Sequence, residues 1–386
     1  MAKTVITNVH IVTEEGILPN TPDTWLMVED GKIVSIECKA GREVPDSVTV
    51  VDGGGGTLVP GSIDLHIHGA NGYDMLDGTT RSIEQVSAVL AKTGCTAFLA
   101  TSVTAPYEDL VSFIKNVHLV RGKEPGASIV GIHLEGPYLN RKRKGMQNED
   151  YLRSPDIEEM KRLLAHADGF VKMVTLAPEL PGGDAMVRFL RDEGIVVSIA
   201  HSEANYDQAK AAFGMGVSHV THCFNAMRSI HHRDPGVVVA AWEDPTVTCE
   251  AIVDNVHLHP AIVRLMHRNL GYDRMALVTD AMQAMGLGDG KYRFGGHVVH
   301  VEDGIARLPD GTLASSTVTM TQAIRNAVQD GIDLFDAVQM SSATPARIVG
   351  LTRKGAIRPG FDADLVVLDK DLKASWVMVR GKVLAG

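Results

Sequence analysis

The chain has 386 residues, of which 45% are hydrophobic and 22% are charged, and its formal net charge is -10. This length suits a large barrel with a smaller satellite domain, and the apolar fraction is enough for a sizeable core. Lys and Arg are scattered along an acidic chain, which argues against nucleic acid or an anionic membrane as the partner. No apolar run approaches the roughly 20 residues of a membrane span, and no signal peptide precedes the first strand-like run. The four isolated cysteines (Cys38, Cys95, Cys223 and Cys249) predict reduced thiols in a cytoplasmic protein.

Both ends of the chain carry short strand patterns broken by turns. Asp30-Gly31 is a hairpin signal, and Gly53–Gly56 is expected to be a turn that links the N-terminal strands to the next region. Neither end alone could bury a sheet well, so we predict that residues 1–55 and 351–386 together build one small β-sandwich. The expected strands are Thr4–Val12, Trp25–Glu29, Lys32–Ile36, Val48–Val51, Asp364–Asp369, Trp376–Val379 and Lys382–Leu384.

Between residues 56 and 350, short apolar runs alternate with amphipathic helical stretches, which is typical of βα units around a parallel sheet. Eight such runs predict an α/β fold, a (β/α)8 barrel with insertions. The expected strands are Ile63–His66, Thr96–Ser102, Ser128–Leu134, Val171–Leu176, Val196–His201, Val217–His222, Thr248–Val253 and Ala276–Asp280. The expected helices include Arg81–Thr93, Ile157–Ala167, Gly183–Glu193, Asn205–Met215, Thr319–Asp330 and Leu334–Ser341.

His66 and His68 end the first predicted barrel strand. Side chains alternate across a strand, so the two imidazoles should point to the same side. Two imidazoles on a rigid element suit zinc or another divalent transition metal, although the spacing alone fits two hydrogen-bonded core histidines equally well.

Later strands supply more polar residues at the same end. Glu135 follows the third strand, His201 and His222 end the fifth and sixth, and Asp280 ends the eighth. Chemistry in a (β/α)8 barrel sits at the C-terminal ends of the strands. Two acids and four histidines at the ends of several strands therefore indicate a metal-dependent active site.

The sequence around these residues resembles the amidohydrolase superfamily, and within it the N-acetylglucosamine-6-phosphate deacetylase family, over nearly the whole chain. The motifs that carry the resemblance are Pro60–Gly69, His133–Pro137, Ala177–Glu179, Ala200–Ser202, Thr221–Met227, Asp234–Gly236, Asp254–His257, Val278–Met282 and Pro359–Leu365.

The resemblance implies a metal site at Glu135, His201 and His222, with Asp280 as the catalytic acid and base. Relatives that keep a His-x-His pair, here His66 and His68, can hold a second ion, so one or two ions are expected. Imidazole and carboxylate ligands favour zinc or iron and also accept cobalt or manganese.

The resemblance also implies a sugar-phosphate pocket. It assigns substrate contacts to Met146, Gln147, Asn225, Ala226, Arg233, His257, Leu313, Ala314 and Ser315. Arg233 can bind phosphate bidentately, and some phosphate contacts in the family come from a neighbouring subunit, which implies a homodimer. Gln147 stands where some relatives have a histidine that stabilises the oxyanion, and this would shift that role towards the metal. Asn255 and Ser315 stand where relatives often have glycine.

The implied reaction is hydrolysis of the acetamide of N-acetyl-D-glucosamine 6-phosphate to D-glucosamine 6-phosphate and acetate, in amino-sugar catabolism. A bound metal ion lowers the pKa of its water to about 7, which gives hydroxide at neutral pH. Asp280 would accept a proton from that water and return one to the amine leaving group.

Two other functions fit the same scaffold. One is another amidohydrolase, either a deacetylase of N-acetylgalactosamine 6-phosphate or a cyclic-amide hydrolase of the dihydroorotase type. The cyclic-amide reaction is disfavoured because it calls for a metal-bridging carboxylated lysine in the slot that Glu135 occupies. The other is a non-catalytic scaffold, which is disfavoured because the chain retains the full set of ligands together with Asp280.

Overall fold

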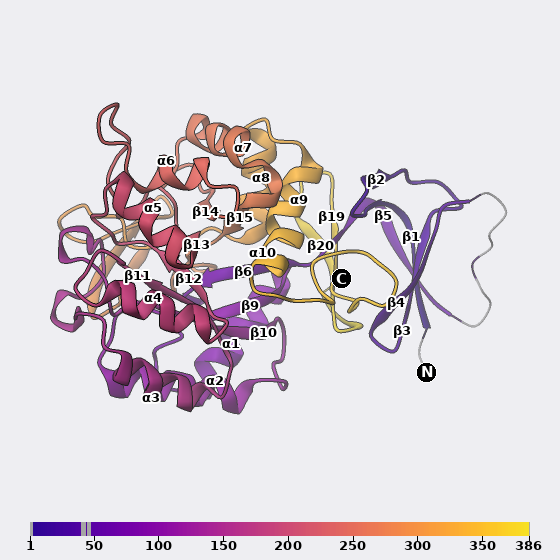
Figure 1. The fold of residues 1–386 in the computed structure, drawn as a ribbon. Coiled ribbons are helices and arrows are strands. Elements are labelled where there is room, and N and C mark those ends of the chain that lie inside the picture. Colours follow the sequence, from indigo (N-terminus) through magenta and orange to yellow (C-terminus); the bar gives the residue numbers. More distant parts are fainter. Residues whose placement is uncertain (1–2, 40–43, 45–47, 386) are drawn as a thin grey trace.

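The computed structural model describes residues 3–39, 44 and 48–385 and shows a barrel beside a smaller sheet (Figure 1). Eight parallel strands form the barrel in the order β6-β9-β10-β11-β12-β13-β14-β15. Their bounds are β6 Ser62–Ile67, β9 Cys95–Ser102, β10 Ser128–Glu135, β11 Val171–Leu176, β12 Val196–Ile199, β13 Val217–Val220, β14 Thr248–Ile252 and β15 Met275–Val278. The two outer strands approach each other where the backbone N–H of Asp280 donates to the carbonyl of His66 at 2.8 Å. These observations confirm the predicted α/β barrel, and every predicted barrel strand matches an observed one to within three residues.

Helices surround the barrel strands (Figure 1). Their bounds are α1 Thr80–Lys92, α2 Tyr107–Val120, α3 Ile157–Ala167, α4 Gly183–Asp192, α5 Tyr206–Met215, α6 Gly236–Glu243, α7 Pro260–Arg274, α8 Met320–Gln329, α9 Leu334–Ser341 and α10 Ala343–Ile348. Short 3-10 turns occupy Arg141–Arg143 and Glu149–Tyr151. Among the described residues, no helix combines the length and the apolar character that crossing a membrane requires.

Local sequence sets where these helices begin. At α5, the side chain of Asn205 accepts from the backbone N–H of Gln208, and the side chain of Gln208 accepts from the backbone N–H of Asn205. This reciprocal capping satisfies two N–H groups that the first turn of a helix leaves unpaired. The capping residue Asn205 lies four residues after His201, so the loop that carries His201 is anchored to α5 at its far end.

Strands from both termini form one mixed sheet, which confirms the prediction that the two ends of the chain pack together. The order is β21-β20-β19-β5-β1-β3-β4, with β2 beside β1. The bounds are β1 Lys3–Val12, β2 Ile17–Leu18, β3 Trp25–Glu29, β4 Lys32–Glu37, β5 Thr49–Pro60, β19 Leu365–Leu368, β20 Ala374–Val379 and β21 Lys382–Ala385. Side chains from both halves of the sheet share one buried cluster, which includes Ile6, Leu26, Leu58, Leu365 and Met378. A second cluster joins the sheet to α1 and α9 through Val366, Ala91 and Val338.

The glycine run Gly53–Gly56 is not the turn that we predicted, because it lies inside β5. The pairing of β1 with β5 shifts register between Thr7 and Val9, so the extra glycines form a bulge. A Cβ atom at Gly53 would lie 2.0 Å from the side chain of Val9, and one at Gly56 would lie 2.6 Å from the carbonyl oxygen of Leu368. Gly53 and Gly56 are therefore needed for close packing within a strand.

A further three-stranded antiparallel sheet lies between β15 and α8 in the chain. It consists of β16 Gly290–Phe294, β17 His297–Glu302 and β18 Ile305–Arg307. The strand patterns in the sequence did not lead us to expect it. Two short strands, β7 Gly69–Ala70 and β8 Tyr73–Asp74, pair with each other just after β6.

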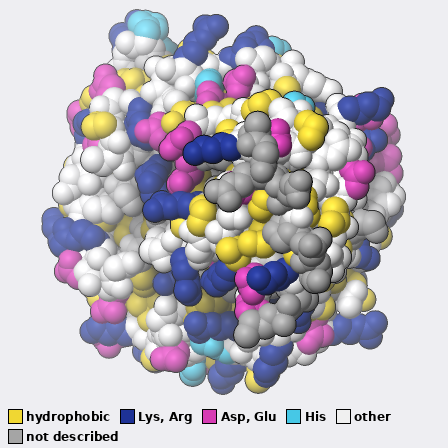
Figure 2. All heavy atoms as spheres, turned by 90° about the vertical axis from the view of Figure 1, so that its right-hand side faces the viewer, with side chains coloured by type: hydrophobic (Ala, Val, Ile, Leu, Met, Phe, Trp, Pro, Cys, Tyr) yellow, Lys and Arg dark blue, Asp and Glu magenta, His cyan; other side chains and the backbone are white. Residues whose placement is uncertain are grey.

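Figure 2 shows the end of the molecule at which the terminal strands lie. On this face, the described Lys and Arg side chains are interspersed with Asp and Glu around a small hydrophobic patch. A nucleic-acid site would instead gather basic side chains into a stripe or patch.

Candidate metal centre and active site

The predicted site residues meet at one rim of the barrel, where the strands end. His66 lies within β6 and His68 follows it, Glu135 is the last residue of β10, and His201 lies two residues beyond β12. His222 and Asp280 lie two residues beyond β13 and β15. His201, His222 and Asp280 have positive φ angles of 45°, 31° and 46°. Positive φ is uncommon for residues other than glycine and clusters at functional sites, so the turns after these strands serve the site.

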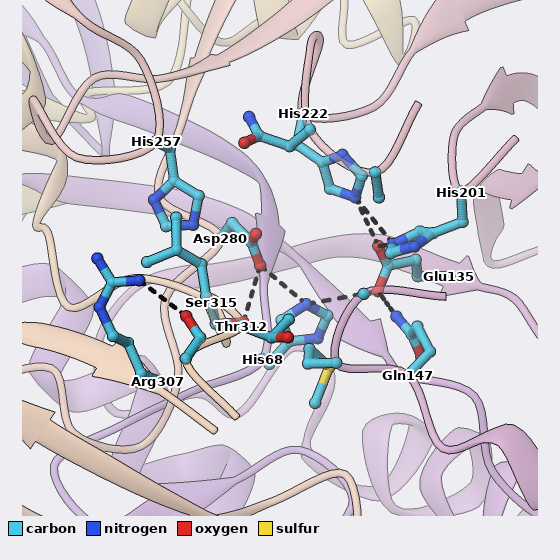
Figure 3. A pocket seen from close by; sticks show the side chains of 16 residues that line it. His68, Glu135, Gln147, His201, His222, His257, Asp280, Arg307, Thr312 and Ser315 are labelled. Carbon is cyan, nitrogen blue, oxygen red and sulfur yellow. Dashed lines mark hydrogen bonds and ion pairs between the residues drawn. The ribbon is translucent and has the colours of Figure 1, made fainter. Parts of the chain in front are cut away.

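Glu135, His201 and His222 form the first group of candidate ligands. The Nε2 atoms of both histidines lie 3.2 Å from Oε1 of Glu135 and 3.1 Å from each other. All three side chains are buried, with exposed fractions of 2–5%. Figure 3 shows His201 and His222 converging on Glu135. Two imidazole nitrogens and one carboxylate oxygen form a donor set that suits zinc or iron.

His66, His68 and Asp280 form the second group. The Nε2 atoms of the histidines lie 3.0 Å apart, as strand alternation predicted. Oδ1 of Asp280 lies 3.2 Å from Nε2 of His68 and 3.6 Å from Nε2 of His66. The donor atoms of this group all lie within 4.8 Å of one another, as do those of the first group. This second group also offers two imidazoles and one carboxylate.

Glu135 lies between the two groups. Its Oε1 atom lies 3.7 Å from Nε2 of His66, and its Oε2 atom lies 3.7 Å from Nε2 of His68. One carboxylate is therefore within reach of both groups, which fits a pair of ions as well as a single ion.

The electrostatics of the cluster call for a cation. Burial lowers the pKa of His66, but the surrounding charges of Asp280, Glu250 and Glu135 raise it to about 10. Burial would raise the pKa of Glu135, but the charge of His66 and hydrogen bonds from His201 and His222 hold it well below its usual range. Without an ion, a proton on His66 supplies positive charge at this position. The cluster thus has the charge balance of a metal centre.

A cavity of about 240 Å³ opens beside the cluster (Figure 3). Seven of the nine residues that we assigned to the substrate line this cavity. They are Met146, Gln147, Asn225, Ala226, His257, Leu313 and Ser315. Its lining also includes His68, Glu135, His201, His222 and Asp280, so the candidate ligands face the same space. Ser315 donates to Oδ1 of Asp280 at 3.1 Å.

Two predicted contact residues do not line this cavity. Ala314 is fully buried and packs in a hydrophobic cluster with Phe294 and Met282. Arg233 lies on the exposed loop beyond β13, where Nη1 hydrogen-bonds Nε2 of His232 at 2.7 Å. Within a single chain, the structure does not bring Arg233 to the cavity.

The side-chain amide of Gln147 is already hydrogen-bonded to protein groups, unlike that of a residue that only donates to an oxyanion. Its side-chain nitrogen donates to Oε2 of Glu135 at 2.5 Å, and its side-chain oxygen accepts from the backbone N–H of Thr104 at 2.8 Å. Both ends of the amide are therefore used to hold Glu135. Gln147 therefore supports Glu135, a candidate metal ligand, and also lines the cavity.

Sequence reasoning missed several residues of the site. Arg307, Gly311 and Thr312 line the cavity from the three-stranded sheet and the turn after it. The turn signal Asp310-Gly311 precedes the predicted segment and could have drawn attention to them. Glu250 contacts His66 from β14, 184 residues away, and no local signal marks it.

Comparisons with known proteins agree with this fold. The model of the amidohydrolase family matches residues 57–384. The chain belongs to the amidohydrolase family. This amidohydrolase is 37% identical to N-acetylglucosamine-6-phosphate deacetylase of Lysinibacillus sphaericus, over 98% of this chain and 97% of the relative. It is 35% identical to N-acetylgalactosamine-6-phosphate deacetylase of Escherichia coli O157:H7, over 97% of each chain. The structure of a mutant N-acetyl-D-glucosamine-6-phosphate deacetylase from Mycobacterium smegmatis, in complex with N-acetyl-D-glucosamine-6-phosphate, is also similar. It is 37% identical, matches with a TM-score of 0.93 and covers 100% of both chains.

Proposed function

We propose that this amidohydrolase removes the acetyl group of N-acetyl-D-glucosamine 6-phosphate in amino-sugar catabolism, giving D-glucosamine 6-phosphate and acetate. The observation that carries the proposal is the position of Asp280, which faces His68 beside two groups of metal-binding side chains on one cavity. The similarity to deacetylases over the whole chain supports the substrate.

Glu135, His201 and His222 would hold one divalent ion, and His66, His68 and Asp280 would hold a second. We propose zinc or iron, with cobalt or manganese as substitutes, because imidazole and carboxylate accept all four. A bound ion polarises the scissile carbonyl and supplies a nucleophilic oxygen at neutral pH.

Asp280 would act as the acid and base of the reaction. Burial raises the pKa of Asp280, but the charge of His66 and the hydrogen bond from His68 lower it overall, so the side chain begins as a carboxylate able to accept a proton. An amide nitrogen leaves only when it is protonated, and Asp280 can return the proton there. Ser315, which donates to Oδ1 of Asp280, holds that oxygen in place.

The phosphate would bind where basic and polar groups line the cavity. We propose His257 and Asn225, as the resemblance indicates, together with Arg307, whose guanidinium matches phosphate geometry. Arg307 is held by a hydrogen bond from Nη1 to the carbonyl of Gly311 at 2.8 Å.

We further propose a homodimer in which Arg233 reaches the cavity of the partner subunit. Its exposed loop would be free to do so. A mixing experiment tests the proposal, because Arg233→Ala and Asp280→Asn remove different parts of one site. If the two residues act across the interface, mixed dimers should regain activity through one complete site. If Arg233 does not cross the interface, mixing should add nothing.

Substrate discrimination is tested by acetate release from N-acetylglucosamine 6-phosphate, its galacto epimer and the unphosphorylated sugar. The gluco phosphate should give the highest kcat/KM, and the unphosphorylated sugar should be turned over poorly. The relative of Escherichia coli O157:H7 makes the galacto phosphate the second candidate, and better turnover of that epimer would move the substrate while keeping the mechanism. No acetate from any of the three would refute the deacetylase proposal. We place the reaction in the cytoplasm, where the four free cysteines would stay reduced.

A further inference from the structure

Glu250 lies behind the metal centre and does not line the cavity. It belongs to β14, and its side chain is completely buried. Its Oε2 atom accepts a hydrogen bond from Nδ1 of His66 at 3.0 Å and another from the backbone N–H of His222 at 2.9 Å. Its Oε1 atom lies 3.2 Å from Nε2 of His219, whose other ring nitrogen lies 2.6 Å from Oγ1 of Thr248.

These contacts do not leave Glu250 free to bind an ion itself. It forms a third cluster of potential ligands with His66 and His133. However, Nδ1 of His133 lies 3.0 Å from the carbonyl oxygen of Leu65, and Nε2 lies 2.7 Å from Oγ1 of Thr175. Both ring nitrogens of His133 and both carboxylate oxygens of Glu250 are therefore already engaged. The remaining ring nitrogen of His66, Nε2, faces His68 and Asp280 and so belongs to the second group of candidate ligands.

We propose that Glu250 is a positioning residue that aligns the two metal-binding groups with each other. By accepting from Nδ1, it fixes His66 in the tautomer whose Nε2 lone pair faces His68 and Asp280. The same oxygen holds the backbone of His222, which has a φ angle of 31° and belongs to the other group. His219 braces the opposite oxygen, so the carboxylate cannot turn away from either task.

Loss of Glu250 should affect metal affinity directly, and catalysis only through the bound metal. A carboxylate that accepts from a metal-binding histidine orients the ring and raises its basicity, and losing it typically weakens metal affinity by about 10- to 100-fold. The side chain of Glu250 contacts the imidazole of His66 in the second group, but in the first group it contacts only the backbone N–H of His222. Its removal should therefore weaken the ion at His66, His68 and Asp280 more than the ion at Glu135, His201 and His222.

The test is a zinc titration of the whole protein, with bound metal counted by mass spectrometry after equilibrium dialysis. The inference rests on the metal centre of the proposed function and does not depend on the substrate. Counting bound ions therefore distinguishes a failure of this inference from a failure of the proposed deacetylation. Wild type should bind two ions per subunit. Glu250→Gln keeps the shape of the side chain and removes its charge, and should lower the affinity for the second ion about 10-fold. Glu250→Ala should lower it about 100-fold, while the first ion is retained.

Glu124→Gln is the matched control. Glu124 is also buried and accepts backbone N–H groups, from Gly122 at 2.9 Å and from Ile129 at 3.2 Å, but it lies away from the metal centre. This variant should bind two ions as wild type does. If Glu250→Gln fails to fold, His219→Asn weakens the brace on the far oxygen while Glu250 itself stays in place, and it should weaken the second ion in the same direction. A wild type that binds one ion at every zinc concentration, or folded variants with unchanged second-ion affinity, would overturn the proposal.

Discussion

Replacing Gln147 with leucine should loosen Glu135 and weaken the ion held by Glu135, His201 and His222. Leucine is similar in size, so the change removes the amide without opening a large hole. The side-chain nitrogen of Gln147 donates to Oε2 of Glu135 at 2.5 Å in a site where both residues are 2% exposed. A hydrogen bond to a charged group contributes about 1.5–3 kcal/mol. At about 1.4 kcal/mol for each factor of ten, the affinity for this ion should fall about 10- to 150-fold.

Gln147→Leu should also lower stability. The backbone N–H of Thr104 loses its acceptor and stays buried, which costs about 1–3 kcal/mol. The assay is competition for zinc with a chelator of known affinity, together with urea unfolding of the metal-free protein.

The matched control for this change is Gln339→Leu. Gln339 is also buried, and it donates to the carbonyl of Thr13 at 3.4 Å, away from the metal centre. It should change stability and leave zinc affinity as in wild type. A folded Gln147→Leu protein whose zinc affinity equals that of wild type would refute the reasoning.

Three further predictions follow from charge and position. Asp280→Asn should lower kcat by about 10²- to 10⁴-fold, because an amide cannot accept and return the proton; a loss below tenfold in a metal-loaded variant would count against the proton role. Arg307→Ala should raise KM for the phosphorylated sugar and leave the unphosphorylated sugar unaffected, and an equal effect on both would remove Arg307 from the phosphate site. Burial raises the pKa of Asp74 to about 6 from 3.8, so the folded state keeps its proton longer than the unfolded state does. Relative to Asp74→Asn, wild type should therefore lose about 3 kcal/mol of unfolding free energy as pH rises from about 3 to 7, of which about 2 kcal/mol is lost between about pH 4 and 6. Urea unfolding across that range should show no such difference if the carboxyl is ionised throughout.

The barrel and the ligand groups were predictable because their signals are local. A strand that ends in His-x-His sends both imidazoles to one side, and the carboxyl ends of parallel strands meet at one rim. That reasoning brought His66, His68, His201 and His222 together in advance. The structure then placed Nε2 of His66 within 3.0 Å of Nε2 of His68, and Nε2 of His222 within 3.1 Å of Nε2 of His201.

What the sequence did not reveal depends on contacts between distant segments. The glycines from Gly53 to Gly56 look like a turn in the sequence. Only the approach of Val9 and Leu368 shows why the strand needs Gly53 and Gly56. Glu250 carries no motif, and its role follows from a contact with His66 across 184 residues. Arg307 lies on a short strand outside the barrel pattern. The domain boundaries after residues 55 and 350 stay predictions.

The central claim is that this chain is a metal-dependent deacetylase of a sugar phosphate, and acetate release tests it most directly. The protein should be stripped of metal with a chelator, divided, and assayed on N-acetylglucosamine 6-phosphate before and after zinc or iron is restored. The account predicts little acetate from the stripped protein and a strong recovery with metal, in proportion to the ions bound. Equal acetate release with and without metal, or none after both metal positions are filled, would contradict it.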